Sequence, residues 1–431
     1  MTAERALIVS SDGHATARMP EYGQYIPERS REEFEAFVVQ YAKFGSKNFE
    51  ARALAARLDP EAVDDWQARF IDTGRLDGNS DPAKRLEEMA AEGVSAEVLI
   101  PDFGTPFEML SPTASGAMGQ DADTRTPQQI ADSCFAFNRW LADFVSYAPE
   151  RFAGMAKIDF DDVEFALKEI AWAHEAGLRG IMVPHMRDDF PVYHPDFDPI
   201  WALVSDLGMV VDCHSGMSSI TRRRPAIPRS APHPSVVAPI LTREFMFAAQ
   251  QLLVHFIWGG VLERHPRLKV VFTEMGSAWA APALAGMDYS FEGSYTRHDT
   301  REVLTMKPSE YFTRQVWLGS SIFSRAEVAA RNELVGPAKM MLGMDFPHHE
   351  GTLATGPGTL GYLRATVGAA GVPADEARLM LGESALDVFG LDRAALSAVA
   401  AEVGPELDLV LTAPEVDEYP RGDVKKPLVY V

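Results

Sequence analysis

The chain has 431 residues, of which 46% are hydrophobic and 24% are charged, so it can bury a large core. Its 40 Lys and Arg residues against 62 Asp and Glu residues give a formal net charge of -22. This charge argues against binding to duplex nucleic acid or to an anionic membrane surface. The two cysteines are too few for a disulfide framework, and the N-terminal apolar run is too short for a signal peptide. We therefore expect a cytoplasmic protein that acts on a small molecule.

Eight short segments rich in Val, Ile, Leu and Met predict buried strands between longer helical patterns. They are 6–11, 96–101, 152–159, 178–184, 209–214, 268–274, 315–320 and 339–345. Nearly continuous apolar strands separated by helices indicate a parallel sheet covered on both faces. Eight such units favour a closed (β/α)8 TIM barrel of the α/β class. We assign residues 1–390 to this barrel and 391–431 to a C-terminal extension that packs on the barrel or on a partner subunit.

The helix ahead of the second predicted strand has the clearest limits. Asp81 can cap its N-terminus, Pro82 suits its first turn, and Gly93 supplies the left-handed residue that ends it.

A TIM barrel needs about 250 residues, so the surplus must lie in insertions. They fall at about 15–80, 102–130 and 215–240, after the first, second and fifth predicted strands. The loops that follow the strands open on the face where barrels of this type carry their active sites. We therefore expect the insertions to surround a substrate pocket.

Four of the predicted strands end in residues of metal-binding type. Asp12 and His14 close the first strand and, being two residues apart, share a face. His214 closes the fifth strand, Glu274 the sixth and Asp345 the eighth. Because the carboxyl ends of all barrel strands meet at one mouth, we expect these five side chains to converge on a metal site.

The sequence resembles the amidohydrolase superfamily, in particular its branch of enzymes like aminocarboxymuconate semialdehyde decarboxylase. The matching segments are SSDGH at 10–14, DPAKRLEEMAAEGVSAEVLIPD at 81–102, YHPDFDPIWALVSDLGMVVDCHSG at 193–216, GGVLERHPRLKVVFTEMGSAW at 259–279 and LGMDFPHHEGT at 342–352. The resemblance implies a TIM barrel, and a metal held by Asp12, His14, His214 and Asp345, with Asp345 handling a proton. The chain departs from the family pattern in having Asp-Gly-His in place of His-x-His, and Glu274 where a histidine is frequent.

The donor set bears on the metal. Three carboxylates and two imidazoles are more donors than one tetrahedral zinc ion uses. Oxygen-rich sites with some imidazole suit iron or manganese, with zinc as a further candidate, and two bridged ions would use all five donors. We therefore expect a binuclear centre of divalent metal. If Glu274 points away from the mouth, the site reduces to one ion.

Four further residues are candidates for the active site. We interpret His348, three residues after Asp345, as a catalytic residue that orients the Asp345 carboxylate. His185 follows the fourth predicted strand and is a metal ligand, a substrate contact or a hydrogen-bonded scaffold group. Arg222 and Arg223 lie in the 215–240 insertion and can hold a substrate carboxylate or phosphate, or form a turn or a subunit contact.

Two reactions fit this set of residues. In the first, a metal-activated hydroxide attacks an amide, ester or thioester carbonyl of a small organic acid derivative. In the second, a proton is delivered to carbon and an aromatic or unsaturated carboxylic acid loses carbon dioxide without oxidation. The carboxylate-rich ligands favour hydrolysis, so a metal-dependent hydrolase is the prediction and a decarboxylase the alternative. The resemblance also implies a homodimer.

Overall fold

The computed structural model describes residues 3–44, 64–102, 104–108, 125–187, 189–218, 237–293, 300–320, 323–348, 351–354 and 358–415. All strand pairs within these residues are parallel, in the order β1-β3-β4-β5-β6-β7-β8-β9, and β2 also pairs with β3. The strands are β1 (Val9–Ser10), β2 (His14–Ala15), β3 (Ala96–Pro101), β4 (Phe152–Lys157), β5 (Gly180–Met182), β6 (Val210–His214), β7 (Lys269–Thr273), β8 (Val316–Ser320) and β9 (Met340–Leu342).

The first and last strands close the sheet into a barrel. The Ser11 N–H donates to the Leu342 carbonyl oxygen at 2.7 Å, and Gly13 forms a parallel bridge with Phe346. Strands β1 and β2 together fill the first of eight positions, which are those predicted. The predicted TIM barrel is therefore confirmed, although the first predicted strand, 6–11, is interrupted and continues as β2.

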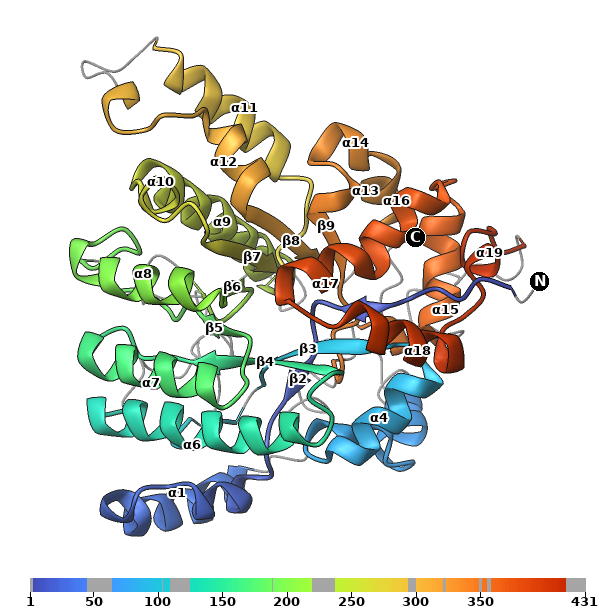
Figure 1. Ribbon diagram of the computed structural model, residues 1–431. Helices are drawn as coiled ribbons and strands as arrows, with labels where there is room; N and C mark the ends of the chain where they lie inside the picture. Colours follow the sequence, from blue (N-terminus) through green and yellow to red (C-terminus); the bar gives the residue numbers. More distant parts are fainter. Residues whose placement is uncertain are drawn as a thin grey trace.

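Helices surround the strands (Figure 1). Those before β7 are α1 (Arg31–Phe44), α4 (Pro82–Ala91), α6 (Pro127–Ser146), α7 (Val163–Glu175), α8 (Asp198–Leu207), α9 (Val237–Trp258) and α10 (Val261–Arg264). Those after it are α11 (Ala280–Phe291), α12 (Pro308–Gln315), α13 (Arg325–Ala329), α14 (Arg331–Leu334), α15 (Gly358–Leu363), α16 (Ala374–Arg378), α17 (Ser384–Phe389), α18 (Arg393–Val403) and α19 (Leu407–Val410). The limits predicted for α4 are confirmed, because the Asp81 carboxylate accepts two backbone N–H groups at its start and Gly93 has a φ of 78° just after its end.

Alternation along the strands divides the core into two layers. Outward side chains pack against the surrounding helices, whereas inward ones such as Val9, Val98 and Met155 fill the barrel. Phe389 of α17 and Leu396 of α18 join this inner cluster. Because the cluster includes residues at the start of several strands, these two helices cover the end of the barrel at which the strands begin. The polar site lies at the other end.

The described part of the C-terminal extension contacts the N-terminal segment. Arg5 and Glu406 form an antiparallel bridge, and the Ala6 N–H donates to the Pro405 carbonyl oxygen at 2.8 Å. Residues 416–431 and most of the insertions predicted at 102–130 and 215–240 lie outside the described residues. Among the described helices, none combines the length and hydropathy needed to cross a membrane. The homodimer and the cytoplasmic location stay predictions.

A buried ion pair between Arg85 and Glu97 supports the first strand. Arg85 of α4 donates to the Glu97 carboxylate at 2.6 Å and to the His14 carbonyl oxygen at 2.9 Å. Its guanidinium lies 3.9 Å from the centre of the Phe346 ring. A side chain on Gly13 would collide with Glu97, because a Cβ there would lie 2.1 Å from its Oε1 atom. Arg85 therefore joins α4, β3, β2 and the segment after β9.

We expect Arg85→Met to lower the free energy of unfolding by about 3–5 kcal/mol, because it leaves the Glu97 carboxylate buried without its partner. Denaturant unfolding followed by circular dichroism measures this loss. Lys84→Met removes a cation from the neighbouring, half-exposed position of the same helix, and its unfolding midpoint should stay near that of the parent. Equal losses in the two variants would contradict the role given to Arg85.

Candidate metal centre

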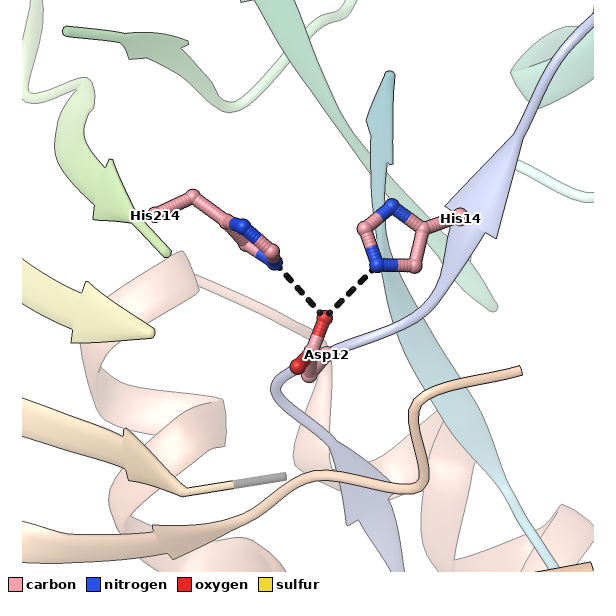
Figure 2. A group of neighbouring side chains, drawn as sticks. All are labelled: Asp12, His14 and His214. Atoms are coloured by element: carbon pink, nitrogen blue, oxygen red, sulfur yellow. Dashed lines mark hydrogen bonds and ion pairs between the residues drawn. The ribbon is translucent and has the colours of Figure 1, made fainter. Parts of the chain in front are cut away.

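Asp12 lies between two histidines at the mouth of the barrel (Figure 2). Its Oδ1 atom is 3.4 Å from Nε2 of His214 and 3.6 Å from Nε2 of His14. His14 belongs to β2 and His214 ends β6, so side chains from opposite parts of the barrel meet at one carboxylate. All three residues are buried, and their ligand atoms lie within 4.8 Å of one another.

Asp345 brings the last strand to the same centre. One of its carboxylate oxygens, Oδ1, is 3.3 Å from His14 Nε2 and 2.8 Å from His348 Nδ1. The His348 ring also lies against the His14 ring, with 4.2 Å between their centroids. His14, Asp345 and His348 thus form a second group of possible metal ligands, which shares His14 with the first.

The break between β1 and β2 fixes Asp12 against Asp345. The Asp12 carbonyl oxygen accepts the N–H of Asp345 at 3.0 Å and the Ser10 hydroxyl at 2.6 Å. Asp345 has a φ of 56° and Glu274 a φ of 60°, in the left-handed region that side chains rarely adopt. Such backbone strain gathers at functional sites, where the surrounding contacts maintain it.

The residues at this centre fit a divalent cation. His14 Nε2 and Asp345 Oδ2 are buried and have no hydrogen-bond partner among the described residues. Buried polar atoms are normally paired, so an unpaired nitrogen and an unpaired carboxylate oxygen on two side chains that approach to 3.3 Å fit a bound cation. The Pro101 carbonyl lies 3.0 Å from His14 Nδ1. Because a carbonyl only accepts, Nδ1 carries the hydrogen and the Nε2 lone pair faces the centre.

Electrostatics agree with a site built for positive charge. Burial lowers the pKa of His214, but the Asp12 carboxylate, with a smaller contribution from Glu274, raises it to about 10. Burial likewise lowers the pKa of His348, whereas Asp345 and Asp102 raise it well above its usual value. In the metal-free protein both imidazoles therefore hold a proton that balances the buried carboxylates.

Glu274 takes a different place from the other predicted ligands. Its Oε2 atom is 3.6 Å from Nδ1 of His214, the ring nitrogen that also contacts the Ser215 carbonyl oxygen at 2.7 Å. Nε2 of the same ring is the atom that faces Asp12. Glu274 is absent from both ligand groups found among the described residues. Its position is that of a carboxylate that orients a histidine ligand from behind.

Of the remaining candidate residues, His185 lies in the described part of the chain and the two arginines do not. His185 Nε2 contacts the Gly216 carbonyl oxygen at 3.1 Å, across the loop that follows β6, and does not belong to either ligand group. Arg222 and Arg223 lie outside the described residues, so their predicted role stays a prediction.

The structure adds Asp102, which the sequence analysis did not single out. Its Oδ1 atom is 3.2 Å from His348 Nε2, and its Oδ2 atom accepts from Asn79 Nδ2 at 2.9 Å. Asp345, His348 and Asp102 therefore form a continuous carboxylate–imidazole–carboxylate chain. The signal was present in the sequence, because Asp102 follows the second predicted strand just as the other acidic candidates follow theirs.

Comparison with known proteins identifies the family. Residues 65–391 match the family described as amidohydrolase. The chain belongs to the amidohydrolase family. The 2-amino-3-carboxymuconate-6-semialdehyde decarboxylase of Dictyostelium discoideum is 25% identical over 286 residues, which are 65% of this chain and 71% of that protein. This relative agrees with the branch that the sequence motifs resemble.

Solved structures share the fold. The 5-carboxyvanillate decarboxylase of Sphingomonas paucimobilis is 23% identical, with a TM-score of 0.58 over 90% of this chain and 100% of that one. A dihydroxybenzoic acid decarboxylase of a Polaromonas species, solved with bound manganese and the inhibitor 2-nitroresorcinol, is 16% identical. Its TM-score is 0.56, over 91% of this chain and 99% of that one.

These relatives correct the predicted reaction. Each of the three is a decarboxylase, so the prediction of a hydrolase is wrong, and the alternative that accompanied it agrees better with the comparisons. The error arose from counting Asp12, His14, His214, Glu274 and Asp345 as five equivalent ligands. In the structure Glu274 lies behind His214, which weakens the argument for a bridged pair of ions.

We expect the affinity for Mn²⁺ to rise with pH by up to roughly tenfold per pH unit between about pH 6 and pH 9, because binding requires neutral imidazole. The folded pKa of His214 is about 10, so its proton is present throughout this range and must leave when the ion binds. Isothermal titration calorimetry in buffers of different ionisation enthalpy measures the protons released. His194→Gln, outside the centre, should behave as the parent. An affinity independent of pH would contradict this assignment.

Proposed function

We propose that this protein is a non-oxidative decarboxylase of an aromatic carboxylic acid that depends on one divalent metal ion, with manganese favoured. The observation that carries the proposal is the buried Asp345 carboxyl group, which shares the centre with the metal ligands and is backed by a second carboxylate through His348. The relatives named above, one of them with bound manganese, support both the reaction and the metal.

The geometry favours one ion over two. Both ligand groups contain His14, and both use the same Nε2 atom, because Nδ1 is engaged with the Pro101 carbonyl. An imidazole nitrogen has a single lone pair and binds a single ion. Asp12, His14, His214 and Asp345 would therefore hold one ion between them, and His348 would keep its ion-pair contact with Asp345.

The reaction needs a proton at carbon and a place for the negative charge of the substrate. A bound divalent ion would supply the charge that holds the substrate oxygens at the centre. A proton passed from His348 through the Asp345 carboxylate would go to the ring carbon that carries the substrate carboxylate. The new carbon–hydrogen bond replaces the carbon–carbon bond, whose electron pair returns to the ring as carbon dioxide leaves. One proton is consumed in each turnover.

The chain behind Asp345 can restore this proton. His348 Nδ1 lies 2.8 Å from the Asp345 carboxylate, and its Nε2 atom is 3.2 Å from Asp102. Asn79 holds the other Asp102 oxygen at 2.9 Å. An imidazole fixed between two carboxylates keeps a constant orientation and can pass a proton from one of its sides to the other.

We expect the protein reconstituted with Mn²⁺ to release carbon dioxide from 2,6-dihydroxybenzoate or 5-carboxyvanillate, measured as product formation by chromatography. Asp345→Asn should lower kcat by about 10²–10⁴-fold because the amide cannot deliver the proton. Asp206→Asn changes an exposed carboxylate on α8 and should leave turnover unchanged. Failure of the metal-loaded protein to decarboxylate these acids and a wider panel of aromatic acids would contradict the proposal.

We expect Asp102→Asn to lower kcat by about 10–100-fold while KM and bound manganese stay the same, since Asp102 lies 3.2 Å from His348, a residue that the proposal does not use as a metal ligand. His348→Gln should cause a similar loss. The double variant should be no worse than His348→Gln alone, because both substitutions interrupt one chain. Additive losses, or loss of the metal in Asp102→Asn, would contradict this arrangement.

A further inference from the structure

Glu327 connects two segments at the mouth of the barrel. It belongs to α13, the short helix that follows β8. Its Oε1 atom accepts the Ser277 N–H at 2.9 Å and the Ser277 hydroxyl at 2.7 Å. Its Oε2 atom accepts the Ser324 N–H at 3.1 Å and the Ser324 hydroxyl at 2.9 Å. One carboxylate therefore holds the segment after β7 against the segment after β8.

The local helix explains only half of these contacts. Ser324 and Glu327 form the capping box of α13, in which the Ser324 hydroxyl also accepts the Glu327 N–H at 3.2 Å. The second carboxylate oxygen has no part in this box and reaches Ser277, which is fully buried. Burial raises the pKa of Glu327, but the hydrogen bonds from Ser277 and Ser324 outweigh it and lower that pKa. Ser277 is therefore bound to a charged acceptor, which makes the stronger kind of hydrogen bond.

The segment that Glu327 holds also carries Glu274. The Glu274 backbone has a φ of 60°, and such strained backbone persists only where surrounding contacts maintain it. Before the strained residue, the Glu274 N–H donates to the Gly319 carbonyl oxygen of β8 at 2.8 Å. After it, the Trp279 indole donates to two carbonyl oxygens of the segment at 2.9 and 3.0 Å. The N–H and hydroxyl of Ser277 complete these contacts, and both depend on Glu327.

Glu274 in turn faces a candidate metal ligand. Its Oε2 atom is 3.6 Å from His214 Nδ1, while the opposite ring nitrogen, Nε2, lies 3.4 Å from Asp12. A carboxylate behind a histidine ligand fixes the orientation of the ring and strengthens its binding to the ion. A shift of the segment after β7 would therefore move the Glu274 carboxylate away from His214 while every ligand stays in the chain.

We propose that Glu327 is a positioning residue for the metal centre and holds the Glu274 carboxylate behind His214 by way of Ser277. The inference rests on the proposed function, because it takes His214 as a ligand of the ion. Glu327 itself is absent from both ligand groups found among the described residues. Its removal should therefore weaken metal binding although no ligand is lost.

The affinity for Mn²⁺, measured by calorimetry at one pH, tests the proposal without turnover. Glu327→Ala should weaken Mn²⁺ binding by about 10–100-fold, and Glu274→Gln should weaken it to a similar degree. The double variant should bind Mn²⁺ no more weakly than Glu274→Gln alone, because Glu327 acts on the ion only through Glu274. Additive losses, or an unchanged affinity in a folded Glu327→Ala variant, would overturn the proposal.

A matched control separates positioning from helix capping. Glu310 of α12 occupies the same capping position as Glu327 and accepts the Lys307 N–H at 2.7 Å. It has no printed contact with the segment that carries Glu274. Glu310→Ala should therefore bind Mn²⁺ as the parent does, and a loss as large as that of Glu327→Ala would overturn the proposal.

Two smaller substitutions decide the matter if Glu327→Ala does not fold. Ser277→Ala removes the hydroxyl on the side of Glu274 and should weaken Mn²⁺ binding by about threefold. Ser324→Ala removes the hydroxyl on the capping side and should leave the affinity unchanged. Circular dichroism shows that each variant is folded. The opposite ranking of the two serine variants would overturn the proposal.

The parent protein distinguishes this inference from the proposed function. A parent that binds no Mn²⁺ would overturn both. The expected pattern of Mn²⁺ affinities in a protein that decarboxylates no aromatic acid would support the role of Glu327 and count against the proposed function alone.

Discussion

Closure of the barrel between its first and last strands is the constraint on which the metal centre depends. The Asp12 carbonyl oxygen accepts the backbone N–H of Asp345, and Ser11 donates to Leu342 one step earlier. These contacts join residues more than 300 positions apart in the chain and place two carboxylates side by side. Arg85 also links the first and last strands, because it contacts both the His14 carbonyl oxygen and the Phe346 ring. Any change that separates the first strand from the last therefore separates Asp12 from Asp345 before it affects the outer helices.

Burying carboxylates at one point is costly unless positive charge accompanies them. In the metal-free protein this charge is a pair of protonated imidazoles, His214 and His348, and a divalent cation would take over part of their task. Each imidazole has its second nitrogen engaged elsewhere: His214 with Ser215 and Glu274, and His348 with Asp102. The surrounding carboxylates and carbonyls thus fix which nitrogen of each ring faces the centre. The charges at the site therefore depend on these local contacts and not on the net charge of the chain.

The sequence was sufficient for the barrel and for most of the ligands, because both follow from strand periodicity and from the rule that strand ends meet. All eight strand positions, the limits of α4, and the convergence of Asp12, His14, His214 and Asp345 could be predicted. The direction of Glu274 could not be predicted, since the meeting of strand ends does not fix where a side chain points and its φ of 60° departs from strand geometry. Asp102 carried the same strand-end signal but could not be ranked without its contact to His348.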